Sequence, residues 1–284
     1  MSDSIPPIQG PSGSGSIPPQ IGYQMPSGPA PRKKNTGVII GLVILAFVLL
    51  SCTGLIGLGA YRANHSGIVV DGVELTRKEV RTAEDEIKTM MASINPQDLS
   101  STNTDFVASN ALSQLVKAYF IELKAAEVDL NAVVDKINVD GILGSQLGTA
   151  SGRQKSRKEA KEVDVAILKY CDRQMKAINV FQTKWGNAFH LGTTFGADSV
   201  ARFQKTQETY KVLSKTRLDL ISFADETRPS TDGKLLLFGK DSEISQYNKM
   251  TDQYNAQFEA FQKAAAEMSK AVSTQFSKSL SDLK

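Results

Sequence analysis

The stretch GVIIGLVILAFVLLSCTGLIGLGAY, residues 37–61, contains no charged side chain. At a rise of 1.5 Å per residue, a helix of this length reaches about 36 Å, enough to cross a hydrocarbon core of about 30 Å with some tilt. The sequence therefore predicts one transmembrane helix over residues 37–61. The fold class that we expect is mainly α, in which this single transmembrane helix is followed by an elongated, coiled-coil-like helical bundle with one small β-hairpin.

The charges that flank this stretch predict the orientation of the chain. Arg32, Lys33 and Lys34 precede it closely, whereas only Arg62 falls within the next fifteen residues. Because cytoplasmic flanks carry the excess of Lys and Arg, we expect a cytoplasmic N-terminus. Residues 62–284 would then form an extracytoplasmic domain on the plasma (inner) membrane of the cell envelope.

Two features of the stretch leave alternatives open. Leu49-Leu50-Ser51-Cys52 resembles a bacterial lipobox, so the chain could instead be a lipoprotein anchored at Cys52. The long segment before the basic cluster, and the apolar residues that continue beyond Cys52, favour an uncleaved helix. Gly37 and Gly41 have the GxxxG spacing that lets two membrane helices pack as a homodimer, although glycine is common in such helices in any case.

The segments on either side of the stretch differ in composition. Residues 1–36 are rich in Pro, Gly and Ser, which cannot bury a core, so we expect a disordered cytoplasmic tail. Residues 62–284 carry 30 Lys and Arg against 29 Asp and Glu, once the four charged residues of the tail are removed from the totals of 33 and 30. Phosphate binding needs a clustered basic excess, so this balance argues against a nucleic-acid partner.

Residues 62–152 are predicted to form a membrane-proximal part that begins with a hairpin. Two β-prone triplets flank Asp71-Gly72, which is the strongest short hairpin signal. Thr76 and Glu79 then form a capping box that predicts the start of a helix. Apolar residues recur along this helix at steps of three and four, at Val80, Ala83, Ile87, Met90 and Ile94.

A second helix of this part is expected over residues 105–137. Its apolar stripe consists of Leu112, Leu115, Tyr119, Leu123, Ala126, Leu130, Val133 and Ile137. The segment 140–152 then contains four glycines without a phosphate-binding fingerprint, and we interpret it as a flexible connector.

Residues 153–284 are predicted to form a bundle of long helices. We expect them over residues 155–185, over residues 198–225, and from residue 242 onward for some forty residues. The stripe of the first consists of Ala160, Val163, Ile167, Tyr170, Gln174, Ile178 (or Ala177), Phe181 and Trp185. The stripe of the second consists of Phe203, Tyr210, Leu213 and Leu220. The last helix would be about 60 Å long, so it needs long partners such as the two helices before it. Before it, Leu235–Phe238 form an apolar run that could pair as a strand with the hairpin at 68–75.

No motif in the chain predicts catalysis, a cofactor or a metal site. The two histidines, His65 and His190, have no carboxylate or cysteine at metal-ligand spacing, and a zinc site needs three or four convergent ligands. Cys171 is expected to be a half-buried structural thiol. We therefore do not expect an enzyme, although the many carboxylates leave that alternative open.

Adaptable or aromatic side chains are the candidates for protein interaction. On the first two helices these are Met90, Met91, Tyr119 and Phe120, which either offer apolar surface or form core. A second group, Trp185, Phe189 and Phe195, could form a contact tip or plug the end of the bundle.

One region resembles a known family. The run Val69-Val70-Asp71-Gly72-Val73-Glu74-Leu75-Thr76-Arg77-Lys78-Glu79-Val80 is similar to the N-terminal chaperone module of bacterial extracytoplasmic prolyl-isomerase chaperones. The pattern of the second helix, from Ala111 to Glu127, is also similar to that family. The resemblance covers residues 67–137, lacks the usual glycine after the second helix and does not include the isomerase domain. It implies a membrane-tethered, chaperone-like module without isomerase activity.

The function that we expect is protein binding by a single-pass, non-enzymatic envelope protein, as a scaffold or by chaperone-like holding of clients. A sensory or small-ligand-binding domain is the alternative, but a short tail is a poor signalling output, so this role would require a separate partner. An enclosed pocket with convergent polar groups would favour the second interpretation, and a solid bundle the first.

Overall fold

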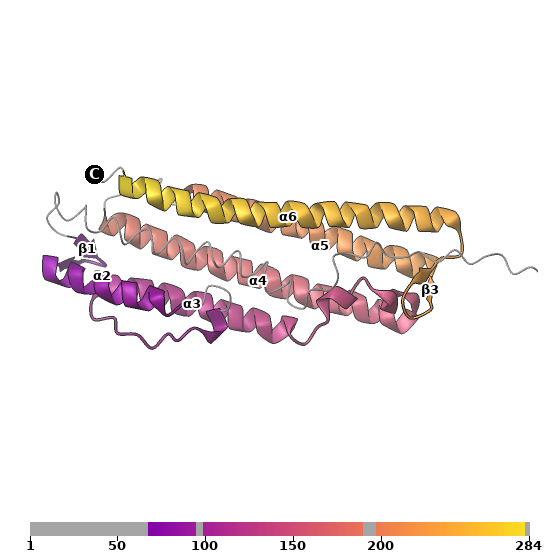
Figure 1. Ribbon diagram of the computed structural model, residues 1–284, viewed down its shortest axis with the longest axis horizontal. Helices are drawn as coiled ribbons and strands as arrows, with labels where there is room; N and C mark the ends of the chain where they lie inside the picture. The colour runs from indigo at the N-terminus through magenta and orange to yellow at the C-terminus, as the bar shows by residue number, and fades with distance from the viewer. Residues whose placement is uncertain (1–67, 95–98, 190–196, 282–284) are drawn as a thin grey trace, which may run out of the picture.

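Four long helices lie side by side along one axis of the molecule, and a shorter fifth helix packs near one end (Figure 1). The computed structural model describes residues 68–94, 99–189 and 197–281. The helices are α2 (Arg77–Ala92), α3 (Ala111–Val134), α4 (Ala150–Ala188), α5 (Ala197–Thr227) and α6 (Asp241–Ser281). The prediction of a mainly helical fold with an elongated bundle is confirmed.

The expected membrane anchor and tail lie outside the described residues. This applies to residues 1–36 and 37–61, and with them to the possible dimer glycines Gly37 and Gly41 and to the lipobox residue Cys52. Within the three ranges that the structure describes, no helix is both long enough and apolar enough to cross a membrane.

An antiparallel hairpin of β1 (Ile68–Val70) and β2 (Val73–Leu75) opens the described part of the chain. Its two-residue turn consists of Asp71 and Gly72, whose φ angles are 50° and 82°. A type I′ turn requires positive φ at both positions, which Gly adopts without penalty and Asp tolerates. The predicted hairpin is therefore confirmed.

Helix α2 begins at the predicted capping box. The backbone N–H of Thr76 donates to Glu79 Oε2 over 2.7 Å, and the N–H of Glu79 donates to Thr76 Oγ1 over 3.3 Å. This reciprocal pair satisfies two amide groups that the first turn of a helix leaves unpaired. The whole predicted stripe is buried: Val80, Ala83, Ile87, Met90 and Ile94.

Helix α3 is shorter than the sequence predicts, because Asn110 caps it. The Asn110 side chain accepts hydrogen bonds from the N–H groups of Leu112 (3.1 Å) and Ser113 (3.2 Å). The preceding segment is irregular, and Lys117 of α3 donates to the carbonyl of Phe106 over 2.7 Å. The stripe is buried from Leu112 to Leu130, whereas its last two members, Val133 and Ile137, are half-buried.

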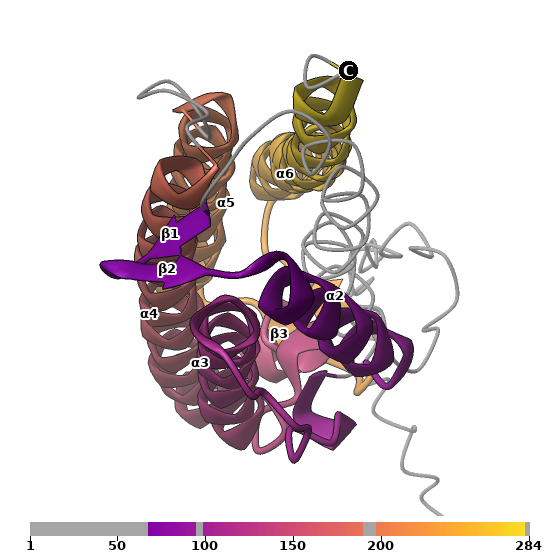
Figure 2. The same cartoon turned by 90° about the vertical axis from the view of Figure 1, so that its left-hand side faces the viewer.

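The long helices pack in chain order. Helix α3 lies on α4, α4 on α5 and α5 on α6, with α2 beside α3 when the molecule is viewed from the hairpin end (Figure 2). The predicted stripes are buried on α4 (Ala160, Val163, Tyr170, Gln174, Ile178, Phe181 and Trp185, with Ile167 half-buried) and on α5 (Phe203, Tyr210, Leu213 and Leu220).

Helix α6 spans 41 residues, so the predicted length of some forty residues is confirmed. Its main partner is α5, and among the described residues it has little contact with α3 or α4. The expectation that both preceding helices cover it is therefore wrong. Because one helix cannot enclose a whole seam, Tyr247 and Ala265 are buried while Phe258 and Phe261 stay half-buried.

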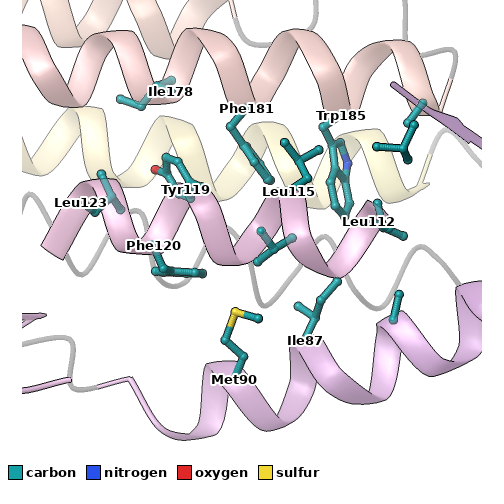
Figure 3. Packing of buried hydrophobic residues seen from close by; sticks show 14 of the residues in the cluster. Ile87, Met90, Leu112, Leu115, Tyr119, Phe120, Leu123, Ile178, Phe181 and Trp185 are labelled. Atoms are coloured by element: carbon teal, nitrogen blue, oxygen red, sulfur yellow. The ribbon is translucent and has the colours of Figure 1, made fainter. Parts of the chain in front are cut away.

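The core consists of two hydrophobic clusters. The hairpin-end cluster joins β1, β2, α2, α3 and the C-terminal half of α4 (Figure 3), and Phe203 of α5 and Ala265 of α6 also belong to it. The far-end cluster joins the N-terminal half of α4, the C-terminal half of α5, the start of α6 and the segments that connect them. Helix α4 contributes residues to both clusters and so connects the two ends of the molecule.

The interpretation of residues 140–152 as a flexible connector is wrong. The segment forms two 3₁₀ turns, η2 (Val139–Gly141) and η3 (Ser145–Gly148), and the side chains of Ile142 and Leu147 are fully buried in the far-end cluster. At Gly148 an added Cβ would lie 2.5 Å from the Cβ of Thr231, so this glycine permits close packing. Since α4 begins at Ala150, the expected division after residue 152 falls within its first turn.

The expected pairing of Leu235–Phe238 with the hairpin is also wrong. Strand β4 (Leu236–Leu237) pairs instead with β3 (Ser230–Thr231), at the opposite end of the molecule from β1 and β2 (Figure 1). The turn between β3 and β4 contains Gly233 at a φ of 94°. The described chain thus has two small hairpins where the sequence predicted one.

Candidate functional site: a groove between two helices and a buried charged network

Five of the seven predicted interaction residues are buried in the hairpin-end cluster. Met90, Tyr119, Phe120, Trp185 and Phe189 are all members of it, and Figure 3 shows the first four pointing into the space between α2, α3 and α4. The ring centroids of Trp185 and Phe189 are 4.7 Å apart, and those of Tyr119 and Phe181 are 4.8 Å apart. This packing matches the alternative in which such residues form core. The side chain of Met91, and Phe195, lie outside what the structure describes.

Two hollows adjoin end to end between α3 and α4. Their volumes are about 590 Å³ and 600 Å³, and Arg173 lines both, so together they form one groove, which we call the α3–α4 groove. Each helix of the pair presents small or apolar residues to it. The lining includes Ala118, Ala126 and Leu130 of α3, and Tyr170, Ala177 and Phe181 of α4.

Two exposed valines lie on the α4 side of the α3–α4 groove, one in each of its hollows. Val165 is 67% exposed and Val180 is 55% exposed, and both lie on the α4 side of the groove. They fall on one stripe of α4 with Lys169, Arg173 and Lys176, because these positions recur at steps of three and four. The solvent-facing side of the groove therefore carries apolar residues at both ends and basic residues between them.

Ion pairs hold the two walls of the α3–α4 groove together. Arg173 of α4 donates to Glu122 and to Asp129 of α3, each over 2.8 Å, and Lys169 lies 3.5 Å from Asp129. The hydrogen bond with Glu122 raises the pKa of Arg173 above its usual value. At the hairpin end, Lys184 pairs with Asp71 over 2.7 Å. The groove therefore has fixed walls.

A second notable cluster of polar groups is buried between α4 and α5. Asp164 of α4 accepts hydrogen bonds from Tyr210 Oη over 2.9 Å and from Ser214 Oγ over 2.6 Å. Arg217 Nη2 donates to the same carboxylate and, over 3.2 Å, to Tyr210 Oη. The Asp164 and Arg217 side chains are only 10% and 5% exposed. We call these four residues the Asp164 network.

The Asp164 network is arranged to fix two helices rather than to perform chemistry. Both oxygens of Asp164 accept hydrogen bonds from α5, so the carboxylate is occupied by internal donors. Burial raises the pKa of Tyr210 far above its ordinary value, so this phenol stays protonated as a donor. A buried charge that loses its partner is costly, and the pairing thereby favours one register of α4 against α5.

The Asp164 network is not among the sites predicted above, although the sequence contains one signal for it. Arg217 occupies the stripe of α5 between Leu213 and Leu220, at the step where the pattern calls for an apolar residue. A charge at such a position predicts a buried partner on a neighbouring helix. Nothing local identifies that partner as Asp164, which lies 53 residues away.

Cys171 is consistent with the expected structural thiol. It is partly exposed, and burial raises the pKa of the thiol to about 12, so it is protonated and unreactive near neutral pH. Among the described residues, no group of three or more His, Cys, Asp or Glu side chains could hold a metal ion. His65 and His190 lie outside the described residues.

Comparison of the chain with protein-family models, with curated proteins and with solved structures gave no significant match. The resemblance of residues 67–137 to the chaperone module of extracytoplasmic prolyl isomerases therefore stays a prediction.

Proposed function

We propose that this protein is a single-pass, membrane-anchored scaffold of the cell envelope, and that it binds another protein in the α3–α4 groove. In this proposal residues 37–61 form the anchor, the N-terminus is cytoplasmic, and the helical domain lies outside the membrane. The protein acts by binding and not by catalysis.

The exposed, apolar α3–α4 groove is the observation that carries the proposal. It combines an apolar lining, valines that face solvent, and walls fixed by the ion pairs of Arg173. A preformed surface loses little conformational entropy when a partner binds, so more of the contact energy remains as affinity. Two parallel ridges with a groove between them are also the shape that receives a helix.

A scaffold role is favoured over chaperone-like holding of clients through the residues that the sequence suggested. Met90, Tyr119 and Phe120 are packed in the hairpin-end cluster, so they could contact a client only if that cluster opened. The α3–α4 groove is accessible without any such opening. A sensory role is less well supported, because both carboxylate oxygens of Asp164 already accept hydrogen bonds from side chains of α5.

Site-specific crosslinking in intact membranes tests the proposal. A photo-crosslinking amino acid is placed at Val165 or Val180 of the full-length chain, and at Val212 as a matched control. Val212 is a valine on α5 that is 50% exposed and does not line the groove. We expect both groove positions to give the same discrete crosslinked protein, and the control position to give none.

The crosslinking experiment has two clear contradicting outcomes. If all three positions give the same diffuse pattern, the groove has no special role in binding. If only Val212 gives a discrete product, the docking surface lies on α5 and the assignment of the groove is wrong.

A further inference from the structure

We infer that the partner segment which the α3–α4 groove receives is an acidic amphipathic helix. This inference rests on the proposed function and goes beyond it, because it names the chemistry of the partner. Three observations lead to it. They are the length and lining of the groove, the backbone groups of its walls, which are already hydrogen-bonded within the helices, and the lining lysines that form no ion pair within the described part of the chain.

The dimensions of the groove fit a helix of the partner. The α3 residues that line it run from Ala111 to Val133 and beyond, which corresponds to about 33 Å at 1.5 Å per residue. A partner helix of about 22 residues, or six turns, would match this length. Residues on one stripe of such a helix could lie on the small side chains of the groove, among them Ala118 and Ala126.

The walls of the groove disfavour an extended peptide. Both walls are α-helices, whose backbone N–H and C=O groups are already paired within each helix. A bound strand would therefore bring its own amide groups against an apolar surface that offers no backbone partners, and unpaired groups of this kind are costly. A helix satisfies its own backbone, so it can pack on such a surface without that penalty.

The acidic residues that line the groove are paired, whereas several of its lysines are not paired within the ranges that the structure describes. Each lining acid pairs with a cation: Glu122 and Asp129 with Arg173, Asp71 with Lys184, and Glu162 with Lys158. Three of the lining lysines, Lys136, Lys161 and Lys176, form no ion pair among the described residues.

The three lysines are placed along the length of the groove and not at one point. Lys136 and Lys161 line one of its hollows and Lys176 lines the other. Acidic side chains that flank the apolar stripe of a partner helix would meet them at several turns, which favours an acidic partner and a defined orientation. Three lysines beside an apolar lining do not provide the clustered basic excess that a nucleic acid requires.

Peptide binding to the full-length chain in phosphatidylcholine nanodiscs tests this inference. The probe is a fluorescent 22-residue helical peptide with Leu along one stripe and Glu beside it, and the matched peptide carries Lys in place of each Glu. Empty nanodiscs give the background. We expect the acidic peptide to bind the wild-type chain at least about tenfold more tightly than the basic peptide.

Charge reversal provides the second half of the test. The variant Lys136→Glu/Lys161→Glu/Lys176→Glu should bind the acidic peptide about tenfold more weakly than wild type does, and it should bind the basic peptide more tightly. The control variant Lys215→Glu/Lys234→Glu/Lys249→Glu changes three exposed lysines that do not line the groove, and it should bind both peptides as wild type does. Circular dichroism verifies that both variants fold.

Several results would overturn the inference. Equal binding of the two peptides, or binding of neither, removes the acidic helix as partner, and the proposed function would survive if Val165 still crosslinks to a protein. Loss of peptide binding when the nanodiscs contain phosphatidylglycerol would assign the lysines to a lipid surface. If the variant Lys136→Glu/Lys161→Glu/Lys176→Glu differs from wild type in oligomeric mass, the occupant of the groove is a second copy of this chain.

Discussion

At the hairpin end, buried aromatic rings from α3 and α4 stack on one another and the ion pairs between elements lie nearer the surface, whereas at the far end charged side chains are themselves buried between the helices. Tyr119, Phe181 and Trp185 form the first arrangement, with centroid distances of 4.8 Å and 5.4 Å. In the second, the Asp164 network joins α4 to α5, and Arg153 reaches both the carbonyl of Leu147 (3.0 Å) and Asp225 (3.1 Å). The same helix α4 takes part in both.

The comparison distinguishes interactions that stabilise the bundle from interactions that fix the alignment of its helices. Stacked apolar rings gain free energy from burial and tolerate small shifts of one helix along another, because the hydrophobic effect has no direction. Buried charges contribute little net free energy, but a shift that separates them is strongly penalised. The far end therefore fixes the alignment of α4 with α5, while the hairpin end supplies much of the apolar burial.

Breaking the buried ion pair should have the largest effect. Arg217→Met leaves Asp164 buried without its cation, and we expect a loss of about 3–5 kcal/mol in the free energy of unfolding. The double variant Asp164→Leu/Arg217→Met removes both charges and should recover most of that loss. Urea denaturation of the full-length chain in mild detergent, followed by circular dichroism, measures both.

Lys215→Met serves as the control for the ion-pair variants, because Lys215 is an exposed residue of the same helix. A loss for Arg217→Met no greater than that of Lys215→Met would mean that the network does not hold α4 to α5. A double variant as unstable as the single one would mean that the cost is not electrostatic.

A smaller effect is expected from the segment that connects α3 to α4. Leu147 is fully buried in the far-end cluster, so Leu147→Ala should lower the free energy of unfolding by about 2–5 kcal/mol. Val165→Ser, on the exposed edge of the groove, should change it by less than about 0.5 kcal/mol. If both changes were equally mild, residues 140–152 would behave as a flexible connector after all.

The sequence predicts the helix faces well, because a stripe depends on local periodicity alone. Every predicted stripe position of α2 is buried, and so are those of α5, from Phe203 to Leu220. The turn at Asp71 and Gly72 and the cap at Thr76 are equally local, and both are present as predicted. These features need no knowledge of which helix packs on which.

Features that depend on residues far apart in the chain could not be predicted from local periodicity. The glycines near Leu147 look like signals of flexibility, yet Gly148 is required by the approach of Thr231, 83 residues further along the chain. The α3–α4 groove likewise exists only where α3 packs on α4, two helices that are separate in the sequence. Five of the seven interaction residues predicted from composition, Phe120 among them, belong to the core instead.

Hydrogen exchange shows directly whether the α3–α4 groove is the docking surface. The full-length chain in phosphatidylcholine nanodiscs is measured alone and with saturating acidic helical peptide. Exchange of a helix amide needs local opening, which a ligand lying across that helix suppresses. We predict slower exchange along α3 and along residues 161–184 of α4, with α6 unchanged. Protection confined to α5 and α6, or no protection at saturation, would mean that the groove is not the docking surface.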